Sequence, residues 1–367
     1  MTKVAILGAG NLAWTLAGDL SLRPRSSYDV TVWTSPDHRS AFDAVAAGGP
    51  LRLTGVATGE FFPALETDLG GAVKSADFII VTVPTLGHVD ILNALAEHDL
   101  STSAVIALPG GGFTLLARRL LRREQFPKFI LETSTSPYAC RKSGNTVAIL
   151  GLKSQIEIAA SKKLDAASRA AIAALFPQRL EWYQDLASIF FSNVNPVAHP
   201  AGILRAREAI ESGVRPLPLF YKECIPAAIG VVLAVDGERL AIVRALGLQS
   251  NTDIGYSKAW YGTDAPDSKT FFETYEGYAT IEAPGSINHR YIKEDVKHIM
   301  VLWVQIAAVC GVKVPVMEYI IDQASNALNE DLRQTGTTLA SLGLEGADKD
   351  AILRALNGMD STEFRRC

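Results

Sequence analysis

A glycine-containing turn close to the N-terminus constrains the fold more than any other feature of this sequence. The apolar run Val4-Ala5-Ile6-Leu7 leads directly into the turn, Gly8-Ala9-Gly10-Asn11-Leu12-Ala13, and Leu12, Leu16 and Leu20 then repeat at helical spacing. This pattern predicts a buried parallel strand that passes through a tight turn into a helix. Dinucleotide-binding folds begin in this way, and a glycine turn in another type of α/β domain is the alternative.

Each position of the turn has its own role in such a fold. Gly8 allows the chain to turn sharply, Gly10 allows the backbone to approach a pyrophosphate, and Ala13 keeps the helix close to the strand. The first residues of the helix present unpaired N–H groups and a partial positive charge. We therefore expect Gly8, Gly10, Asn11, Leu12 and Ala13 to bind the phosphates of a dinucleotide cofactor.

The composition is typical of a soluble protein with a large core. The chain has 367 residues, 48% of them hydrophobic and 20% charged, and this length predicts two domains. A formal charge of −4 without a basic run argues against nucleic acid or an anionic membrane as the main partner. No stretch reaches the roughly 18 apolar residues that a membrane span requires. The N-terminal apolar run is also too short for a signal peptide.

The cysteines indicate a reducing compartment. Cys140, Cys224, Cys310 and Cys367 lie far apart and form no Cys-x-x-Cys pair. This spacing is typical of reduced thiols and not of a disulfide framework or a zinc site. We therefore expect a cytoplasmic protein without a metal centre.

The first half of the chain alternates predicted strands with helical patterns. The expected strands after the first are Asp29–Trp33, Phe78–Val83, Ala104–Leu108, Phe129–Glu132 and Thr146–Leu150, and Ala160–Leu175 has a helical pattern. Repeated strand–helix–strand units predict a mostly parallel sheet that is covered on both faces. Ligands of such sheets bind at the carboxyl ends of the strands, so we expect the loops Pro84-Thr85, Pro109–Gly112 and Thr133–Ser136 to face the cofactor.

The second half of the chain is predicted to be helical. Its long amphipathic stretches are Ile229–Leu246, Val296–Cys310, Val316–Leu328 and Ala351–Leu356. Gly247 and Gly311 follow two of these stretches as helix stops. We therefore predict an α/β dinucleotide-binding domain of the Rossmann type over residues 1–183 and an all-α domain over residues 184–367.

The end of the second predicted strand bears on the choice of cofactor. NAD-binding domains usually place an Asp or Glu there, which accepts hydrogen bonds from the adenosine ribose. Thr34 occupies that position here and is followed by Ser35 and Arg39. Thr34 and Ser35 can donate hydrogen bonds to a 2′-phosphate and Arg39 can pair with it, so the sequence favours NADP(H). NAD(H) is the alternative. In that case Arg39 is a solvated surface charge and Asp37 binds the ribose.

Two segments of the helical half carry candidate catalytic residues. His199 lies in Asn195-Pro196-Val197-Ala198-His199-Pro200, at a predicted helix start, and Asp295 shares a helical face with Ile299 and Leu302. A carboxylate at the head of an apolar stripe is costly to bury without a neutralising partner, and a histidine from elsewhere in the fold would provide one. The alternatives are that His199 caps its helix or fills a polar pocket, and that Asp295 stabilises its own helix N-terminus.

With these segments in view, the sequence resembles the opine dehydrogenases, a family that includes octopine, nopaline and carboxyethyl-norvaline dehydrogenases. The resemblance covers nearly the whole chain, and its most specific parts are Asn-x-x-x-His-Pro and Arg-x-x-x-x-Asp, in this order behind a dinucleotide fold. Besides the glycine turn, it includes Glu132–Arg141, Asn195–Pro200, Asn288–Val296, Gly311–Pro315 and Leu339–Leu344.

The resemblance implies a reductive condensation of two small molecules. The amine of an amino acid attacks the carbonyl of a 2-oxo acid, and NAD(P)H reduces the resulting imine to a secondary amine. His199 is implied as the general acid/base, and Asp295 as the carboxylate that orients and stabilises its imidazole. Arg290 is implied as the partner of a substrate carboxylate, with a structural ion pair as the alternative.

Other classes of protein fit parts of the sequence. A reductase similar to ketopantoate reductase or glycerol-phosphate dehydrogenase would use a catalytic lysine, and Lys222 is the one lysine in a suggestive context. A non-catalytic NADP(H)-binding sensor would need no catalytic histidine. Tyr221, Trp260 and Tyr261 are candidates for lining the substrate cleft, although aromatic residues are more often part of the core. The helical half also has enough apolar surface for a homodimer.

Overall fold

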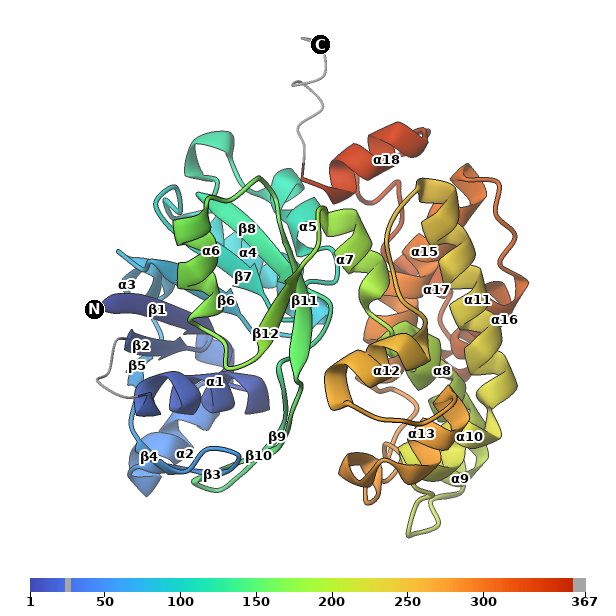
Figure 1. Cartoon of the computed structure of the whole chain (residues 1–367), viewed down its shortest axis with the longest axis horizontal. Helices are drawn as coiled ribbons and strands as arrows, with labels where there is room; N and C mark the ends of the chain where they lie inside the picture. The colour runs from blue at the N-terminus through green and yellow to red at the C-terminus, as the bar shows by residue number, and fades with distance from the viewer. Residues whose placement is uncertain (24–27, 359–367) are drawn as a thin grey trace. The chain divides into compact units, whose positions relative to one another are not determined.

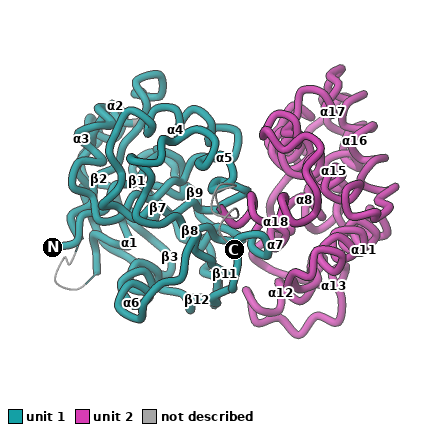
Figure 2. Tube along the Cα trace, turned by 90° about the horizontal axis from the view of Figure 1, so that it is seen from above, with its two compact units in different colours: residues 1–189 teal, residues 190–367 magenta. Residues whose placement is uncertain are grey.

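The chain folds into two compact units. The computed structural model describes residues 1–23 and 28–358. Its first unit is Met1–Ile189 and its second is Phe190–Cys367 (Figure 2). The division falls within helix α7 (Leu186–Ser192), and the boundary predicted after residue 183 lies just before this helix.

An eight-stranded sheet forms the centre of the first unit (Figure 1). Its order is β12 (Arg179–Trp182), β11 (Gln155–Ala160), β8 (Phe129–Thr133), β7 (Ala104–Ala107), β6 (Phe78–Val81), β1 (Thr2–Leu7), β2 (Tyr28–Trp33) and β5 (Ala64–Glu66). All neighbouring strands run parallel except β8 and β11, which are antiparallel. The mostly parallel sheet and the Rossmann-type fold predicted from the glycine turn are therefore confirmed.

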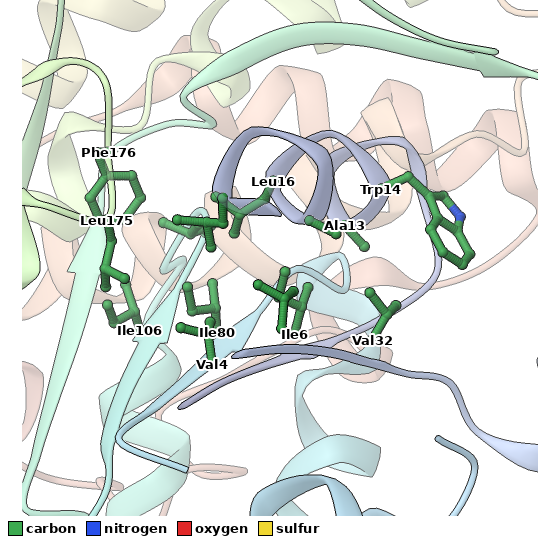
Figure 3. Close-up of a cluster of buried hydrophobic side chains, with 14 of the residues drawn as sticks. Val4, Ile6, Ala13, Trp14, Leu16, Val32, Ile80, Ile106, Leu175 and Phe176 are labelled. Atoms are coloured by element: carbon green, nitrogen blue, oxygen red, sulfur yellow. The ribbon is translucent and has the colours of Figure 1, made fainter. Parts of the chain in front are cut away.

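Helices cover both faces of this sheet, and the strand residues alternate between them. Ile6 packs with Ala13 and Leu16 of α1 (Asn11–Leu22) on one face (Figure 3). Leu7 belongs to the core on the other face, which is built with α4 (His88–Leu95) and α5 (Phe113–Leu120). A strand that is buried on both sides reads as a continuous apolar run, which is why the sequence revealed the central strands.

A second sheet was not foreseen. It has the order β4 (Gly59–Phe61), β3 (Leu51–Gly55), β10 (Thr146–Leu152) and β9 (Tyr138–Ser143). The predicted strand at Thr146–Leu150 exists, but it pairs here with β3 and β9 and not in the parallel sheet. This sheet packs against α1, which places β9 beside the glycine turn.

The helix predicted over Ala160–Leu175 is only partly correct. Ala160 ends strand β11, and α6 spans Ala166–Ala173. The helix begins late because Asp165 caps it: its carboxylate accepts a hydrogen bond of 2.7 Å from the N–H group of Ser168.

The second unit is built mainly from helices. They are α8 (Asn195–Arg205), α9 (Arg207–Ser212), α10 (Ile225–Ala227), α11 (Ile229–Leu246), α12 (Asp253–Tyr261), α13 (Ser268–Thr274), α14 (Arg290–Ile292), α15 (Val301–Val309), α16 (Pro315–Leu328), α17 (Leu332–Thr335) and α18 (Lys349–Leu356). Gly247 and Gly311 follow α11 and α15 with φ values of 71° and 69°, so both predicted helix stops are confirmed. None of the described helices has the length and apolar character needed to cross a membrane.

Two stretches of this unit have π-helical hydrogen bonding, which the sequence did not indicate. The first π segment is Phe220–Cys224 and the second π segment is Lys293–Met300. The predicted helix Val296–Cys310 is therefore irregular at its start, where α14, the second π segment and α15 follow one another.

Three of the cysteines lie in the described part of the chain. Cys140, Cys224 and Cys310 are free thiols. Cys367 lies outside the described residues.

Candidate active site

The glycine turn at the end of β1 has the geometry that a dinucleotide requires. Gly8 has φ of 125°, and a Cβ atom there would lie 2.7 Å from Oγ1 of Thr82, so only glycine fits. A Cβ atom on Gly10 would meet nothing within 4 Å, which leaves the turn open to a ligand. Within the described structure no side chain caps α1, so its first N–H groups are available to phosphate oxygens.

The other predicted residues of this turn support it through packing. Ala13 is buried and Leu12 is half-buried against the core of the sheet. The side-chain oxygen of Asn11 accepts a hydrogen bond of 2.9 Å from the N–H group of Lys142 on β9. Asn11 therefore ties the turn to the second sheet.

The loop Pro109–Gly112 follows β7 and differs from the first glycine turn, because a side chain already binds the N–H groups of the helix that follows it. Glu132, buried on the neighbouring strand β8, accepts hydrogen bonds from the N–H groups of Gly112 and Thr114 at 3.0 and 2.7 Å. A Cβ atom on Gly110 would lie 2.2 Å from this carboxylate. Burial raises the pKa of Glu132. Glu132 therefore already binds the N–H groups at the start of α5, whereas the start of α1 is left for an anion.

Two further loops that we expected to face the cofactor differ in their exposure. Pro84 is exposed and precedes a short 3₁₀ turn, Thr85–Gly87. Thr133, Ser134 and Thr135 are buried. Thr133 bonds within its own loop, where its hydroxyl donates to the carbonyl of Thr135 at 2.9 Å.

The end of β2 carries hydroxyl groups and an exposed guanidinium. Thr34 is buried, and its N–H group donates to the carbonyl of Glu66 at 3.3 Å. Ser35 shares a hydrogen bond of 2.9 Å with Nδ1 of His38. The side chain of Arg39 is 67% exposed and lies 3.4 Å from Asp43. An exposed ion pair of this kind contributes little to stability, so Arg39 is free to exchange its partner for a ligand.

His199 and Asp295 form a buried pair in the second unit. His199 lies inside α8, and its Nδ1 atom shares a hydrogen bond of 2.8 Å with Oδ2 of Asp295. The two residues are 5% and 2% exposed. The alternative in which His199 caps its helix is wrong, since α8 begins at Asn195 without a side-chain cap. The partner of Asp295 is an imidazole from a distant part of the sequence, as the cost of burying a carboxylate suggested.

Both partners of this imidazole come from π segments. Asp295 lies in the second π segment, and Tyr221, in the first, places its hydroxyl 3.0 Å from Nε2 of His199. The ring of Tyr291 stacks on the imidazole, with 4.0 Å between ring centroids. π turns occur frequently at functional sites. The imidazole is therefore fixed on both nitrogens and on one face.

Burial dominates the electrostatics of the pair. It raises the pKa of Asp295 to about 8 and lowers the pKa of His199 well below its ordinary value. The positive charge of Arg290 lowers both pKa values, so it opposes the effect of burial on Asp295 and adds to the effect of burial on His199. The two groups interact so closely that they gain and lose a proton as one unit.

Arg290 begins α14, five residues before Asp295 in the sequence. Its side chain is 52% exposed, and its guanidinium lies 3.8 Å from the buried carboxylate of Glu294. It also lies 5.3 Å from the centre of the Tyr291 ring. The ion pair that we considered as the alternative role is thus present, but at a distance longer than a hydrogen bond. A half-exposed guanidinium held so loosely retains donors for another carboxylate.

A small cavity of about 50 Å³ lies beside His199. Tyr221, Trp260 and Tyr261, the aromatic candidates from the sequence, all line it. Asp253 also lines it, and nothing in the sequence pattern singled this residue out. Lys222 is exposed and does not line this cavity.

Comparison with known proteins identifies the family. A family model described as NAD/NADP octopine/nopaline dehydrogenase, alpha-helical domain, matches residues 182–328. A second model, NADP oxidoreductase coenzyme F420-dependent, matches residues 3–108. The chain is 51% identical over 360 residues to Protein ocs of Agrobacterium tumefaciens (strain Ach5), covering 98% of this chain and 100% of that protein. It is 52% identical over 359 residues to vitopine synthase of Allorhizobium ampelinum, with the same coverage.

Solved structures share the fold. An octopine dehydrogenase in complex with NADH and agmatine matches with a TM-score of 0.79 at 23% identity, over 96% of this chain and 98% of that one. A ketopantoate reductase from Ralstonia eutropha matches with a TM-score of 0.64 at 22% identity, over 91% of this chain and 100% of that one. The fold is therefore common to both classes of enzyme, and it is the relatives of 51% and 52% identity that decide between them. The chain belongs to the opine dehydrogenase family and is an NAD(P)H-dependent oxidoreductase that acts on a CH–NH bond.

Proposed function

We propose that this opine dehydrogenase joins the amine of an amino acid to a 2-oxo acid with His199 as its general acid/base. The observation that carries the proposal is the buried hydrogen bond of 2.8 Å between His199 and Asp295, at the edge of an aromatic cavity. Asp295 holds Nδ1, so the other ring nitrogen is the one that exchanges a proton with substrate. This division of roles between a carboxylate and an imidazole is typical of catalytic dyads.

The proton transfers follow from the two nitrogens of His199. Loss of the carbonyl oxygen of the 2-oxo acid as water requires a proton, which Nε2 donates while Asp295 stabilises the imidazole. Nε2 is bonded to the hydroxyl of Tyr221, which therefore has to move aside or pass the proton on. The reduced nicotinamide, when bound, supplies the hydride for the imine carbon. In the reverse direction Nε2 accepts the proton.

Arg290 is the proposed partner of a substrate carboxylate. Both substrates carry a carboxylate, and the forked guanidinium binds such a group through two parallel hydrogen bonds. The separation of 3.8 Å from Glu294 supports this role, because replacing so long a contact costs little. Glu294 then keeps the guanidinium near the pair of His199 and Asp295 without saturating its donors.

For the cofactor we propose a preference for NADP(H). Support comes from the end of β2, where Thr34, Ser35 and Arg39 provide donors and no acid occupies the ribose position. The open start of α1, with Gly8, Gly10, Asn11, Leu12 and Ala13, fits the pyrophosphate of either cofactor. Among related folds, an octopine dehydrogenase structure holds NADH and a yersinopine dehydrogenase structure holds NADP⁺.

We further propose a cytoplasmic location and a homodimer. The free thiols of Cys140, Cys224 and Cys310 support a reducing compartment. Exposed apolar side chains on α11 and α16, Leu233 and Tyr319, support association through the helical unit. Sedimentation of the purified protein tests the dimer directly.

The experiment that tests the function measures loss of NADPH or NADH absorbance with a 2-oxo acid and a panel of amino acids. Pyruvate belongs in the panel because an octopine dehydrogenase structure contains it. Oxidation that requires both an oxo acid and an amine is the expected result. Oxidation with the oxo acid alone would indicate a simple reductase. Cofactor binding without turnover in the whole panel would indicate a sensor.

A further inference from the structure

Asp253 is a buried carboxylate that the proposed mechanism does not use. It is the first residue of α12, is 3% exposed and lines the same cavity as His199. The hydroxyl of Ser268 donates a hydrogen bond of 2.7 Å to its Oδ2 atom. The backbone N–H group of Asp253 donates a hydrogen bond of 3.0 Å to Oδ2 of Asp236. The side chain thus lies between a structural network and the cavity.

The network behind Asp253 does not neutralise its charge. Arg239, fully buried, donates two hydrogen bonds to Asp236, from Nε at 2.9 Å and from Nη2 at 2.6 Å. The remaining donors of Arg239 are used by Phe191, Ser250 and Asn251. In the described part of the chain no cation forms an ion pair with Asp253. Arg239 forms its ion pair with Asp236 and acts on Asp253 only from a distance, lowering its pKa while Asp236 raises it, so Asp253 has no ion pair of its own within the described residues.

A structural role alone would not require this charge. Burial, and the neighbouring charge of Asp236, raise the pKa of Asp253 to about 6, so the carboxylate is ionised at neutral pH at a cost in stability. An asparagine side chain has nearly the same shape, and its carbonyl oxygen would accept the same hydrogen bond from Ser268. A buried charge that costs stability and has no ionic partner is typical of a ligand-binding group.

The rest of the cavity has the chemistry of a cation site. Trp260, Tyr261, Phe272 and Tyr278 contribute aromatic rings to the lining, and the faces of such rings attract cations. At about 50 Å³, the cavity is several times the roughly 10–15 Å³ that one water occupies on this measure. It therefore has room for an ammonium or guanidinium group beside His199.

We propose that Asp253 binds a cationic nitrogen of the amino-acid substrate in this aromatic cavity. The inference rests on the proposed function, since it assumes that an amino acid is the amine. Two sources supply such a nitrogen: the α-ammonium group, which every amino acid carries, and a basic side chain. If Asp253 binds a basic side chain, its charge disfavours an acidic side chain in the same place.

The test compares Asp253→Asn with the wild type over L-arginine, L-lysine, L-norvaline and L-glutamate. One charge-assisted hydrogen bond corresponds to roughly a tenfold to hundredfold change in affinity. We expect the KM for the amine to rise by this factor, with the KM for the 2-oxo acid unchanged. A rise for all amines assigns Asp253 to the α-ammonium, and a rise for arginine and lysine only assigns it to the side chain. An unchanged amine KM for every substrate overturns the proposal.

Ser268→Ala is the matched control, because it removes the hydrogen bond to Asp253 and keeps the charge. We expect a lower Tm and a nearly unchanged amine KM for this variant, and a higher Tm for Asp253→Asn. Equal losses of amine affinity in both variants would mean that Asp253 acts only through the architecture of α12 and α13.

Binding measurements separate this proposal from the proposed function. In calorimetric titrations of the wild-type protein loaded with NADP⁺, n-butylammonium should bind and n-butanol should not. Binding of this cation without turnover of any oxo acid and amine would refute the enzymatic function but not the cation site. Turnover with no difference between the two probes would refute the cation site but not the function.

Discussion

Replacing Asp295 by asparagine tests the proposed dyad most directly. The carboxylate is 2.8 Å from Nδ1 of His199, which places the centres of the two charges about 4 Å apart when the imidazole is protonated. At an effective dielectric constant of about 20, opposite charges at this separation attract each other by about 4 kcal/mol. Since about 1.4 kcal/mol corresponds to a factor of ten, Asp295→Asn should lower kcat about 1,000-fold.

The assay is steady-state oxidation of NADPH with saturating substrates, together with a fluorescence titration of the cofactor. Glu294→Gln is a suitable control, because it removes a buried carboxylate next to Asp295 that pairs with Arg290. We expect this control to change kcat by less than about tenfold, as it leaves the imidazole with its partner. A kcat for Asp295→Asn within the range of the control would refute the dyad.

The pH dependence provides a second measurement on the same pair. Burial raises the pKa of Asp295 to about 8, so the pair holds an additional proton below pH 8 and loses it above. Proton donation is required for synthesis, so kcat in that direction should fall as the pH rises through about 8. Proton acceptance in the reverse direction should gain from the same change. Both pH dependences, the fall of kcat for synthesis and its rise for the reverse reaction, should be absent in Asp295→Asn. If they persist in this variant, another group is responsible for them.

The remaining predictions concern the residues around this pair and the cofactor. His199→Ala should lower turnover by roughly 100-fold or more and leave cofactor affinity intact, as measured by titration with NADPH. Arg290→Ala should raise the KM for one carboxylate substrate by roughly tenfold to hundredfold, the range of a charge-assisted hydrogen bond, and unchanged constants for both substrates would show that Arg290 is misassigned. Arg39→Ala should raise the KM for NADPH and not for NADH, while Asp43→Asn, which removes the surface partner of Arg39, should leave that preference intact. Equal KM changes for both cofactors would remove the argument for NADP(H).

Much of the fold could be predicted because local sequence determined it. The central strands are apolar runs, since they are buried on both faces of the sheet, and Gly8 has a conformation that only glycine adopts easily. Helix α11 has the predicted bounds, Ile229–Leu246, because an apolar stripe and Gly247 mark its length and its end. In each case the signal lies within a few residues of the feature.

The second sheet could not be predicted because its pairing is non-local. Strand β3 ends at Gly55 and β10 begins at Thr146, and short mixed segments of this kind do not specify a distant partner. The antiparallel pairing of β11 with β8 could not be predicted for the same reason. The helical pattern of Ala160–Leu175 suggested a helix from Ala160, whereas the helix begins only after its cap, Asp165.

The candidate site depends on an irregularity that a periodic pattern cannot reveal. His199 and Asp295 were found as residue types in a specific spacing, but Tyr221 and Asp295 reach the imidazole from π segments that both pack against α8. A π turn contains one more residue than an α turn, and one residue corresponds to a rotation of about 100° around a helix axis. Asp295 and Ile299 lie four residues apart and would share one face of a regular helix, so the π turns act instead by rotating the residues before them relative to the residues after them. Asp295 and Ile299 are both buried where the second π segment packs against α8, and there the carboxylate at the head of the apolar stripe meets a histidine from another helix.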